Sequence, residues 1–248
     1  ILSVSPDLPV KIYDYAGSPD SLTARYPDVP VRVHSADDGD QAPPKRAVQS
    51  SRHLPGMSPL YVRPISSSTT PVYWHLDLLD SVDFSLDGRY STTTLGGVTG
   101  SIGGSAPDVW VIDTGVKTTL ADFGGRVSFY ADILNQGVTT DLDGHGTKVA
   151  SLITSSTFGD TLSNVYSVRV LAGSIGSTID VIEGLYTVKN AVTHRRKIVS
   201  MSIGSGPNSA LDVAVEKLLA AGIAVVVSAG NDGGNACNYS PARVPGVI

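Results

Sequence analysis

A regular alternation of two kinds of segment in the second half of the chain most constrains its fold. Short apolar segments occupy residues 108–113, 165–171, 197–204 and 223–230. Segments with apolar residues at three- and four-residue spacing separate them, at residues 146–156, 177–194 and 208–222. Short apolar runs predict buried strands, and the longer spacing predicts amphipathic helices. The alternation therefore predicts an α/β fold in which a parallel β-sheet carries helices on both faces.

Polar residues follow three of the predicted strands, at the edge where binding sites form in parallel sheets. Asp113 ends the first strand, residues 202–205 close the third, and residues 228–232 follow the last. In open parallel sheets, ligands bind outside the carboxyl ends of the strands. The sequence therefore predicts a functional site at this edge.

Three polar side chains near this edge, Asp113, His145 and Asn231, fit the chemistry of acyl transfer. The carboxylate would fix the tautomer of the imidazole, the imidazole would take a proton from a nucleophile, and the carboxamide would donate a hydrogen bond to the oxyanion. Each residue taken alone also fits a plain structural role, in a turn, a loop or a left-handed backbone conformation. Their order along the chain, at one predicted edge, favours the catalytic interpretation.

The segments around these residues resemble motifs of the subtilisin-like serine proteases, the subtilases, and most closely those of the proteinase K and aqualysin branch. "VWVIDTGV" at 109–116 is similar to the aspartate motif, and "DGHGTKVA" at 143–150 to the histidine motif. "VVVSAGNDGGNACNYSPARVPGV" at 225–247 is similar to the region of the oxyanion asparagine. The resemblance runs from Tyr73 to the last residue. It implies a subtilisin-like fold and a serine endopeptidase that acts on polypeptides.

The resemblance implies a role for each matching residue. Asp113 and His145 would be two members of an Asp-His-Ser triad, and Asn231 would be the oxyanion-hole donor. Two walls of a cleft would bind a polypeptide substrate as an added, extended strand. These walls are formed by Ser202, Ile203 and Gly204, and by Ser228, Ala229 and Gly230. A further stretch, Ser174, Ile175 and Gly176, matches less closely because its loop is one residue shorter than in proteinase K.

The nucleophile of the family lies in a late Gly-Thr-Ser motif, and this sequence contains no such motif. In the same branch, the backbone carbonyls of Pro245 and Val247 match ligands of a structural calcium site whose carboxylate would lie beyond residue 248. Cys237 matches a cysteine that, in aqualysin-like relatives, bonds to another further along the chain. The resemblance therefore implies a domain that is incomplete at its C-terminus, with no cofactor for catalysis and no peptidase activity of its own.

Two residues of the histidine motif depart from the family pattern. Lys148 stands where relatives have a second histidine, and Ser151 stands where they have glycine. A cation one helical turn after His145 would disfavour the protonated ring, to an extent set by solvent exposure. Extra atoms in a packed position typically cost about 1–3 kcal/mol. Asp141 and Asp143 are interpreted as solvated turn residues, because the other histidines lack metal-ligand spacing.

A change of composition near residue 72 divides the chain into three parts. Residues 73–248 are predicted to be the N-terminal part of the peptidase domain, and the Pro- and Ser-rich residues 41–72 to be a linker. Residues 1–40 contain the alternating segments "VKIYDYAG" and "VPVRVHSA", which are typical of short strands. Two interpretations of residues 1–40 stay open: the remnant of an inhibitory propeptide, which subtilases commonly carry, or an unstructured extension.

Charge and hydropathy argue against other partners. The net charge is −5, with no run of Lys or Arg, which disfavours nucleic acid and anionic membranes as partners. No apolar stretch reaches the roughly 18 residues of a membrane helix. The resemblance implies a secreted protein, whose signal peptide would precede Ile1. The alternative function is a non-catalytic module of the same fold, which would bind peptides or proteins without cutting them.

Overall fold

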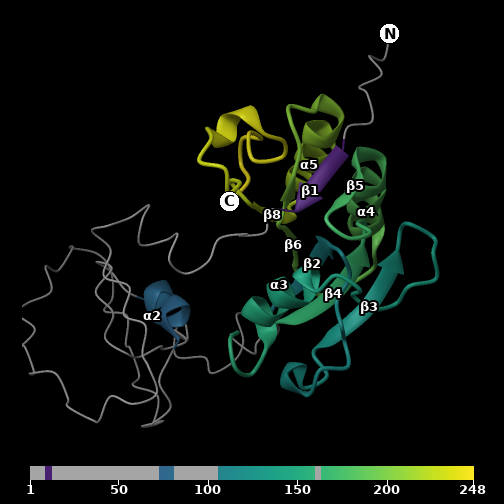
Figure 1. Ribbon diagram of the computed structural model, residues 1–248, viewed down its shortest axis with the longest axis vertical. Helices are drawn as coiled ribbons and strands as arrows, with labels where there is room; N and C mark the ends of the chain where they lie inside the picture. Colours follow the sequence, from purple (N-terminus) through teal and green to yellow (C-terminus); the bar gives the residue numbers. More distant parts are fainter. Residues whose placement is uncertain (1–8, 13–72, 81–105, 160–162) are drawn as a thin grey trace, which may run out of the picture. The chain divides into compact units, whose positions relative to one another are not determined.

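The fold is organised around a five-stranded sheet in the computed structural model, which describes residues 9–12, 73–80, 106–159 and 163–248. The strand order is β3-β4-β2-β6-β8, and every neighbouring pair is parallel (Figure 1). The strands are β2 (Asp108–Asp113), β3 (Val127–Asp132), β4 (Asn164–Arg169), β6 (Lys197–Met201) and β8 (Ala224–Val227). The predicted parallel sheet is confirmed, and four of its strands overlap the predicted segments.

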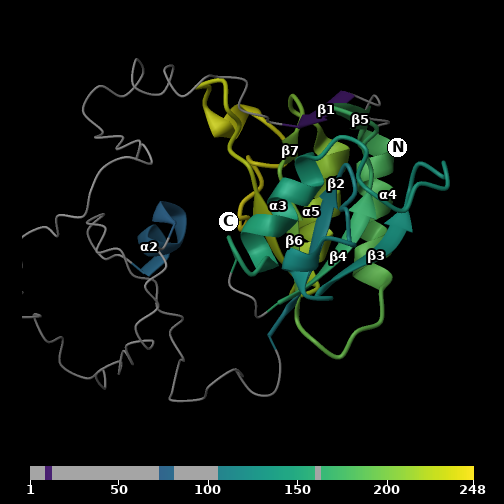
Figure 2. The same cartoon turned by 60° about the horizontal axis from the view of Figure 1, so that its bottom comes forward.

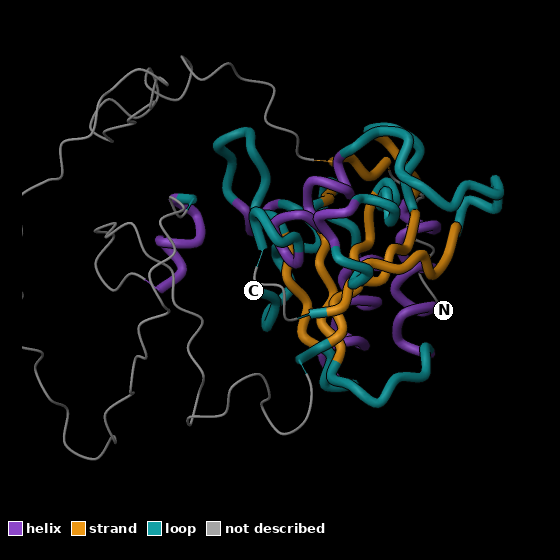
Figure 3. The backbone as a smooth tube through the Cα atoms, turned by 90° about the horizontal axis from the view of Figure 1, so that it is seen from below, coloured by secondary structure: helices purple, strands orange, loops and turns teal. Residues whose placement is uncertain are grey.

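Three helices cover the two faces of this sheet: α3 (His145–Thr154), α4 (Thr178–Asn190) and α5 (Ser209–Ala220). Side chains of β2 alternate between the faces. Trp110 and Ile112 belong to a core that includes the buried residues of α4 and α5. Val109 and Val111 belong to a second core with Ala150 of α3. The sheet therefore lies between α3 on one face and α4 and α5 on the other, as the views in Figures 2 and 3 show.

A second, antiparallel sheet contains β1 (Pro9–Ile12) between β5 (Ile175–Ser177) and β7 (Ile203–Gly204). Val10 pairs with Gly176 of β5, and Lys11 pairs with Gly204 of β7. Val10 is fully buried, whereas Pro9 and Lys11 are exposed. We call the position between β5 and β7, which β1 occupies, the strand slot.

The structure corrects the predicted elements at three places. The segment at 197–204 is two strands, because residues 197–201 pair in the parallel sheet and residues 203–204 pair with β1. The helix predicted at 177–194 ends at Asn190, where the Lys197 ammonium donates to the backbone oxygens of the last turn. Strand β3 was not predicted, because it lies at the sheet edge and most of its side chains are partly or fully exposed.

The remaining described elements are short. They are helix α2 (Trp74–Asp80) and two 3-10 helices, Ala121–Phe123 and Ala236–Asn238. The Tyr73 ring packs against Phe158, with ring centroids 4.8 Å apart. No helix of the described residues is long and apolar enough to cross a membrane. The predicted linker at 41–72 and most of residues 1–40 lie outside the described residues, so the division of the chain into three parts stays a prediction.

Candidate active site

The structure brings together Asp113, the last residue of β2, and His145, the first residue of α3. The Nδ1 atom of His145 lies 2.8 Å from Oδ1 of Asp113. Both side chains are buried, with 7% of His145 and 1% of Asp113 exposed. Because an ionised carboxylate only accepts hydrogen bonds, Nδ1 donates, and the neutral ring then carries its lone pair on Nε2. The pair therefore has the arrangement of a general base oriented by a carboxylate.

The two glycines beside His145 have separate structural reasons. Gly144 precedes α3 with a φ of 105°, a left-handed conformation that favours glycine. A Cβ atom on Gly146 would lie 2.1 Å from the backbone oxygen of Gly115 and 3.1 Å from Oδ1 of Asp113. The absence of a side chain at Gly146 thus allows the first turn of α3 to approach the end of β2.

Burial dominates the electrostatics of Asp113. Desolvation raises the pKa of this carboxyl above its ordinary value, and hydrogen bonds from His145 and Thr114 oppose that rise. The backbone N–H of Thr114 donates to Oδ1 at 2.7 Å. Within the described part of the chain, Oδ2 of Asp113 has no hydrogen-bond partner. An ionised Asp113 with so few donors would stabilise a cation beside it, and the His145 ring would become that cation once Nε2 takes a proton.

In the loop before His145, one of two aspartates predicted to be solvated turn residues, Asp141, is instead half-buried. Asp143 is exposed, as expected for a solvated turn residue, and accepts from the backbone N–H of His145 at 3.2 Å. Asp141 is half-buried, and its carboxylate accepts from the Thr147 hydroxyl at 2.6 Å and the Thr114 hydroxyl at 2.9 Å. The position of Asp141 four residues before the helix start is a signal for a capping role, but its contact with Thr114 depends on the tertiary fold.

The two departures in the histidine motif are accommodated by α3. Lys148 is exposed, so water screens the effect of its charge on the His145 ring. Ser151 is half-buried, and its hydroxyl donates to the backbone oxygen of Thr147 at 2.8 Å. The added hydroxyl therefore has a hydrogen-bond partner within the helix.

The other predicted site residues lie at the carboxyl edge of the sheet. Ser202 stands between β6 and β7, Ile203 and Gly204 form β7, and Ser174 directly precedes β5. Ser228, Ala229, Gly230 and Asn231 follow β8, and the side chain of Asn231 is exposed. The backbone N–H of Ser228 donates to the oxygen of Met201 at 3.1 Å, so the start of the second predicted wall lies beside the end of β6, next to the first wall.

The features that imply calcium and a disulfide lie near the end of the chain. Calcium takes about six to eight oxygen ligands, of which the carbonyls of Pro245 and Val247 would supply two. Within the described ranges, no three or more His, Cys, Asp or Glu side chains gather as a metal site. Cys237 is exposed on the last 3-10 helix. The calcium site and the disulfide both stay predictions.

Comparison with known proteins places this geometry in context. The model of the subtilase family matches residues 104–248. An extracellular serine proteinase from Thermus sp. (strain Rt41A) is 38% identical over 183 residues, which cover 72% of this chain and 42% of that protein. Alkaline serine exoprotease A from Vibrio alginolyticus is 39% identical over 181 residues, or 72% of this chain and 32% of that protein. The matched part of the chain thus spans less than half the length of each of these two relatives.

A solved structure gives the same result for the fold. The crystal structure of a cold-adapted subtilisin-like serine proteinase is 36% identical in sequence and superimposes with a TM-score of 0.63. The match covers 72% of this chain and 63% of that one.

Proposed function

Because the chain belongs to the subtilase family, we propose that it is part of a serine endopeptidase in which Asp113 and His145 are two members of an Asp-His-Ser triad. The nucleophilic serine would come from outside these 248 residues, since the sequence contains no Gly-Thr-Ser motif. The observation that carries the proposal is the buried hydrogen bond of 2.8 Å between Asp113 and His145.

In the proposed reaction, each group acts at a defined atom. Nε2 of His145 takes the proton of the serine hydroxyl as its oxygen attacks the scissile carbonyl carbon, and then gives that proton to the leaving amine. Asp113 holds the ring through Nδ1 and stabilises its protonated form. Asn231, in the loop after β8, would donate a hydrogen bond to the oxyanion. Water then hydrolyses the acyl-enzyme.

The strand slot supports an extended polypeptide as the substrate. Main-chain hydrogen bonds on both sides hold an added strand, and alternate side chains decide which sequences fit. β1 already has this arrangement, with Val10 buried and Lys11 exposed. We include in the proposal that residues of the N-terminal segment act as a resident occupant of the slot, in the manner of an inhibitory propeptide.

The slot alone fits the alternative function equally well, because a binding module also needs a place for an extended strand. The Asp113–His145 pair distinguishes the two functions. Binding a strand does not require an imidazole held in one tautomer by a buried carboxylate, whereas general-base catalysis does. We also propose that the protein is secreted, which agrees with the extracellular proteinase of Thermus as that protein is named, and that a structural calcium ion lies at Pro245 and Val247.

A fluorophosphonate probe tests the proposed triad, because it phosphonylates only a serine that a nearby base activates. The protein as its source organism makes it should be labelled on one serine, in a peptide outside residues 1–248. His145→Ala should slow labelling by about a thousandfold or more. His194→Ala is the matched control, because His194 is an exposed histidine. Labelling of a serine within residues 1–248, or labelling that survives His145→Ala, would contradict the proposal.

A further inference from the structure

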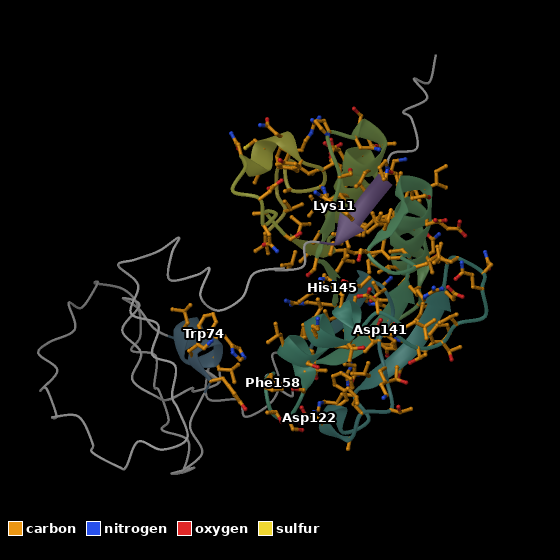
Figure 4. The ribbon with its side chains drawn as sticks, viewed as in Figure 1. Lys11, Trp74, Asp122, Asp141, His145 and Phe158 are labelled. Atoms are coloured by element: carbon orange, nitrogen blue, oxygen red, sulfur yellow. The ribbon has the colours of Figure 1, made fainter. Side chains whose placement is uncertain are left out.

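We propose that Asp141 is a positioning residue for the Asp113–His145 pair. Its carboxylate joins the turn that follows Asp113 to the start of the helix that carries His145, and so sets the geometry between the two side chains. The inference rests on the proposed function, because it concerns the same site. Figure 4 labels Asp141 in the loop that leads to His145.

The Asp141 carboxylate accepts five hydrogen bonds. Oδ1 accepts from the Thr114 hydroxyl at 2.9 Å and from the backbone N–H groups of Asp143 at 3.0 Å and Gly144 at 2.9 Å. Oδ2 accepts from the backbone N–H of Thr147 at 2.9 Å and from its hydroxyl at 2.6 Å. Both oxygens therefore accept from donors within residues 143–147, and Oδ1 also accepts from the turn after β2.

Four of these five hydrogen bonds are local, and a cap at the start of α3 explains them. They join Asp141 to residues two to six positions further along the chain. The bond from Thr114 is different, because it spans 27 residues. A local cap has no need of this contact, so it is the contact that indicates a role at the site.

Thr114 connects the carboxylate to both members of the pair. Its backbone N–H donates to Oδ1 of Asp113 at 2.7 Å. Its hydroxyl oxygen accepts from the backbone N–H of Gly146, the residue after His145, at 3.0 Å. Because Asp141 only accepts, it takes the single hydroxyl proton of Thr114 and leaves the lone pairs of that oxygen for Gly146. Asp141 thereby fixes the orientation of the hydroxyl that links β2 to α3.

The charge of Asp141 suits this role. Desolvation of the half-buried carboxyl raises its pKa, but the hydrogen bonds from Thr147, Gly144 and Thr114 outweigh that effect and hold the pKa below its ordinary value. The group is therefore ionised at neutral pH, and its hydrogen bonds are charge-assisted. A negative charge is also favoured at the N-terminal end of a helix.

The test follows the hydrogen-bonded Nδ1 proton of His145 by NMR in the 248-residue chain, with circular dichroism as the measure of folding. Asp141→Asn replaces one accepting oxygen with an N–H₂ group, which cannot accept from the N–H and hydroxyl donors around it, so it should break several of the five hydrogen bonds. Thr114→Val removes the long-range link to Asp141 together with the hydrogen bond that the Thr114 hydroxyl accepts from Gly146, and it leaves the four local bonds of Asp141 in place. Both variants should speed exchange of the Nδ1 proton with water by about tenfold or more, or abolish its signal. Thr114→Ser restores the hydroxyl and should restore the signal.

Asp122→Asn is the matched control, because Asp122 accepts from Thr157 beyond the other end of α3. It should leave the Nδ1 proton unchanged. A folded Thr114→Val chain with an unchanged Nδ1 proton would overturn the proposal, even if Asp141→Asn unfolds. So would a Thr114→Val chain that unfolds while Thr114→Ser folds, since the hydroxyl would then serve stability alone. The readout needs no hydrolysis, so it is independent of the probe test of the triad.

Discussion

Replacement of Gly146 by alanine tests whether the close approach of α3 to β2 builds the site. Alanine in a helix is favoured over glycine by about 1 kcal/mol. Against this, the new Cβ would lie 2.1 Å from the backbone oxygen of Gly115, where ordinary carbon–oxygen contacts begin near ~3.3 Å. Neither the new Cβ nor the backbone oxygen of Gly115 is the end of a flexible side chain, so the first turn of α3 must move away by about 1 Å. Such overpacking costs about 1–3 kcal/mol or more.

Because the clash is severe and involves backbone, the overpacking cost should lie at the upper end of that range, about 2–3 kcal/mol. After the gain of about 1 kcal/mol in helix propensity, the expected net effect is a loss of about 1–2 kcal/mol in the free energy of unfolding. The same movement would lengthen the Nδ1–Oδ1 contact from 2.8 Å to nearly ~4 Å, beyond hydrogen-bond range. Urea unfolding followed by circular dichroism measures the first effect, and the Nδ1 proton signal of His145 measures the second.

Two further glycines serve as controls. Gly184→Ala gains the same helix propensity in α4, but its Cβ would meet a side-chain methyl of Val170 at 2.7 Å, and a side-chain methyl can shift more easily than the backbone oxygen that a Cβ on Gly146 would meet. It should lose less stability and keep the Nδ1 signal. A Cβ on Gly206 would meet nothing within 4 Å, so Gly206→Ala should be nearly neutral. A Gly146→Ala chain that is as stable as the unmodified chain and retains the Nδ1 proton signal would contradict this prediction.

Three other predictions address the triad, the slot and acid stability. The 248-residue chain should not hydrolyse a peptide p-nitroanilide; hydrolysis by a homogeneous preparation that is lost with His145→Ala would refute this. Val10→Asp should displace β1 from the strand slot, because burial of the valine side chain is worth about 1.5–3 kcal/mol. A labelled extended peptide should then bind about tenfold to a hundredfold more tightly, as measured by fluorescence anisotropy. Pro9→Ala, at an exposed position, should change the affinity little. Although desolvation opposes them, backbone N–H donors and Arg169 hold the pKa of Asp132 below its ordinary value. Its stabilisation is therefore complete above about pH 4 and lost as the pH falls through the lower folded value. At neutral pH, the Asp132→Asn chain should be less stable than the unmodified chain, and it should lose less stability when the pH is lowered. Urea titrations at neutral and at acidic pH measure both effects, and equal losses of stability on acidification in the two chains would contradict this role of Asp132.

The local sequence pattern predicted strands and helix caps correctly where they depend on residues close together in the chain. The strand at 108–113 is predicted with its observed bounds, because all six residues are buried and a run of four apolar residues stands between two aspartates. Asn208 accepts from the N–H groups of Ala210 and Leu211, a cap that depends only on neighbouring residues. Strand β3 was not predicted, because most of its side chains are exposed or half-buried and its sequence shows no alternation of apolar and polar residues.

The sequence by itself determined the α/β class, the order of most strands and helices, and the candidacy of Asp113 and His145, because these follow from periodicity and from residues next to strand and helix ends. Only the tertiary structure decided that their side chains meet, that Gly146 must lack a Cβ, and that Thr114 reaches Asp141 across 27 residues. It also decided that residues 9–12 pair between β5 and β7. Each of these contacts joins segments distant in the chain, and no local pattern specifies which distant backbone a residue will meet.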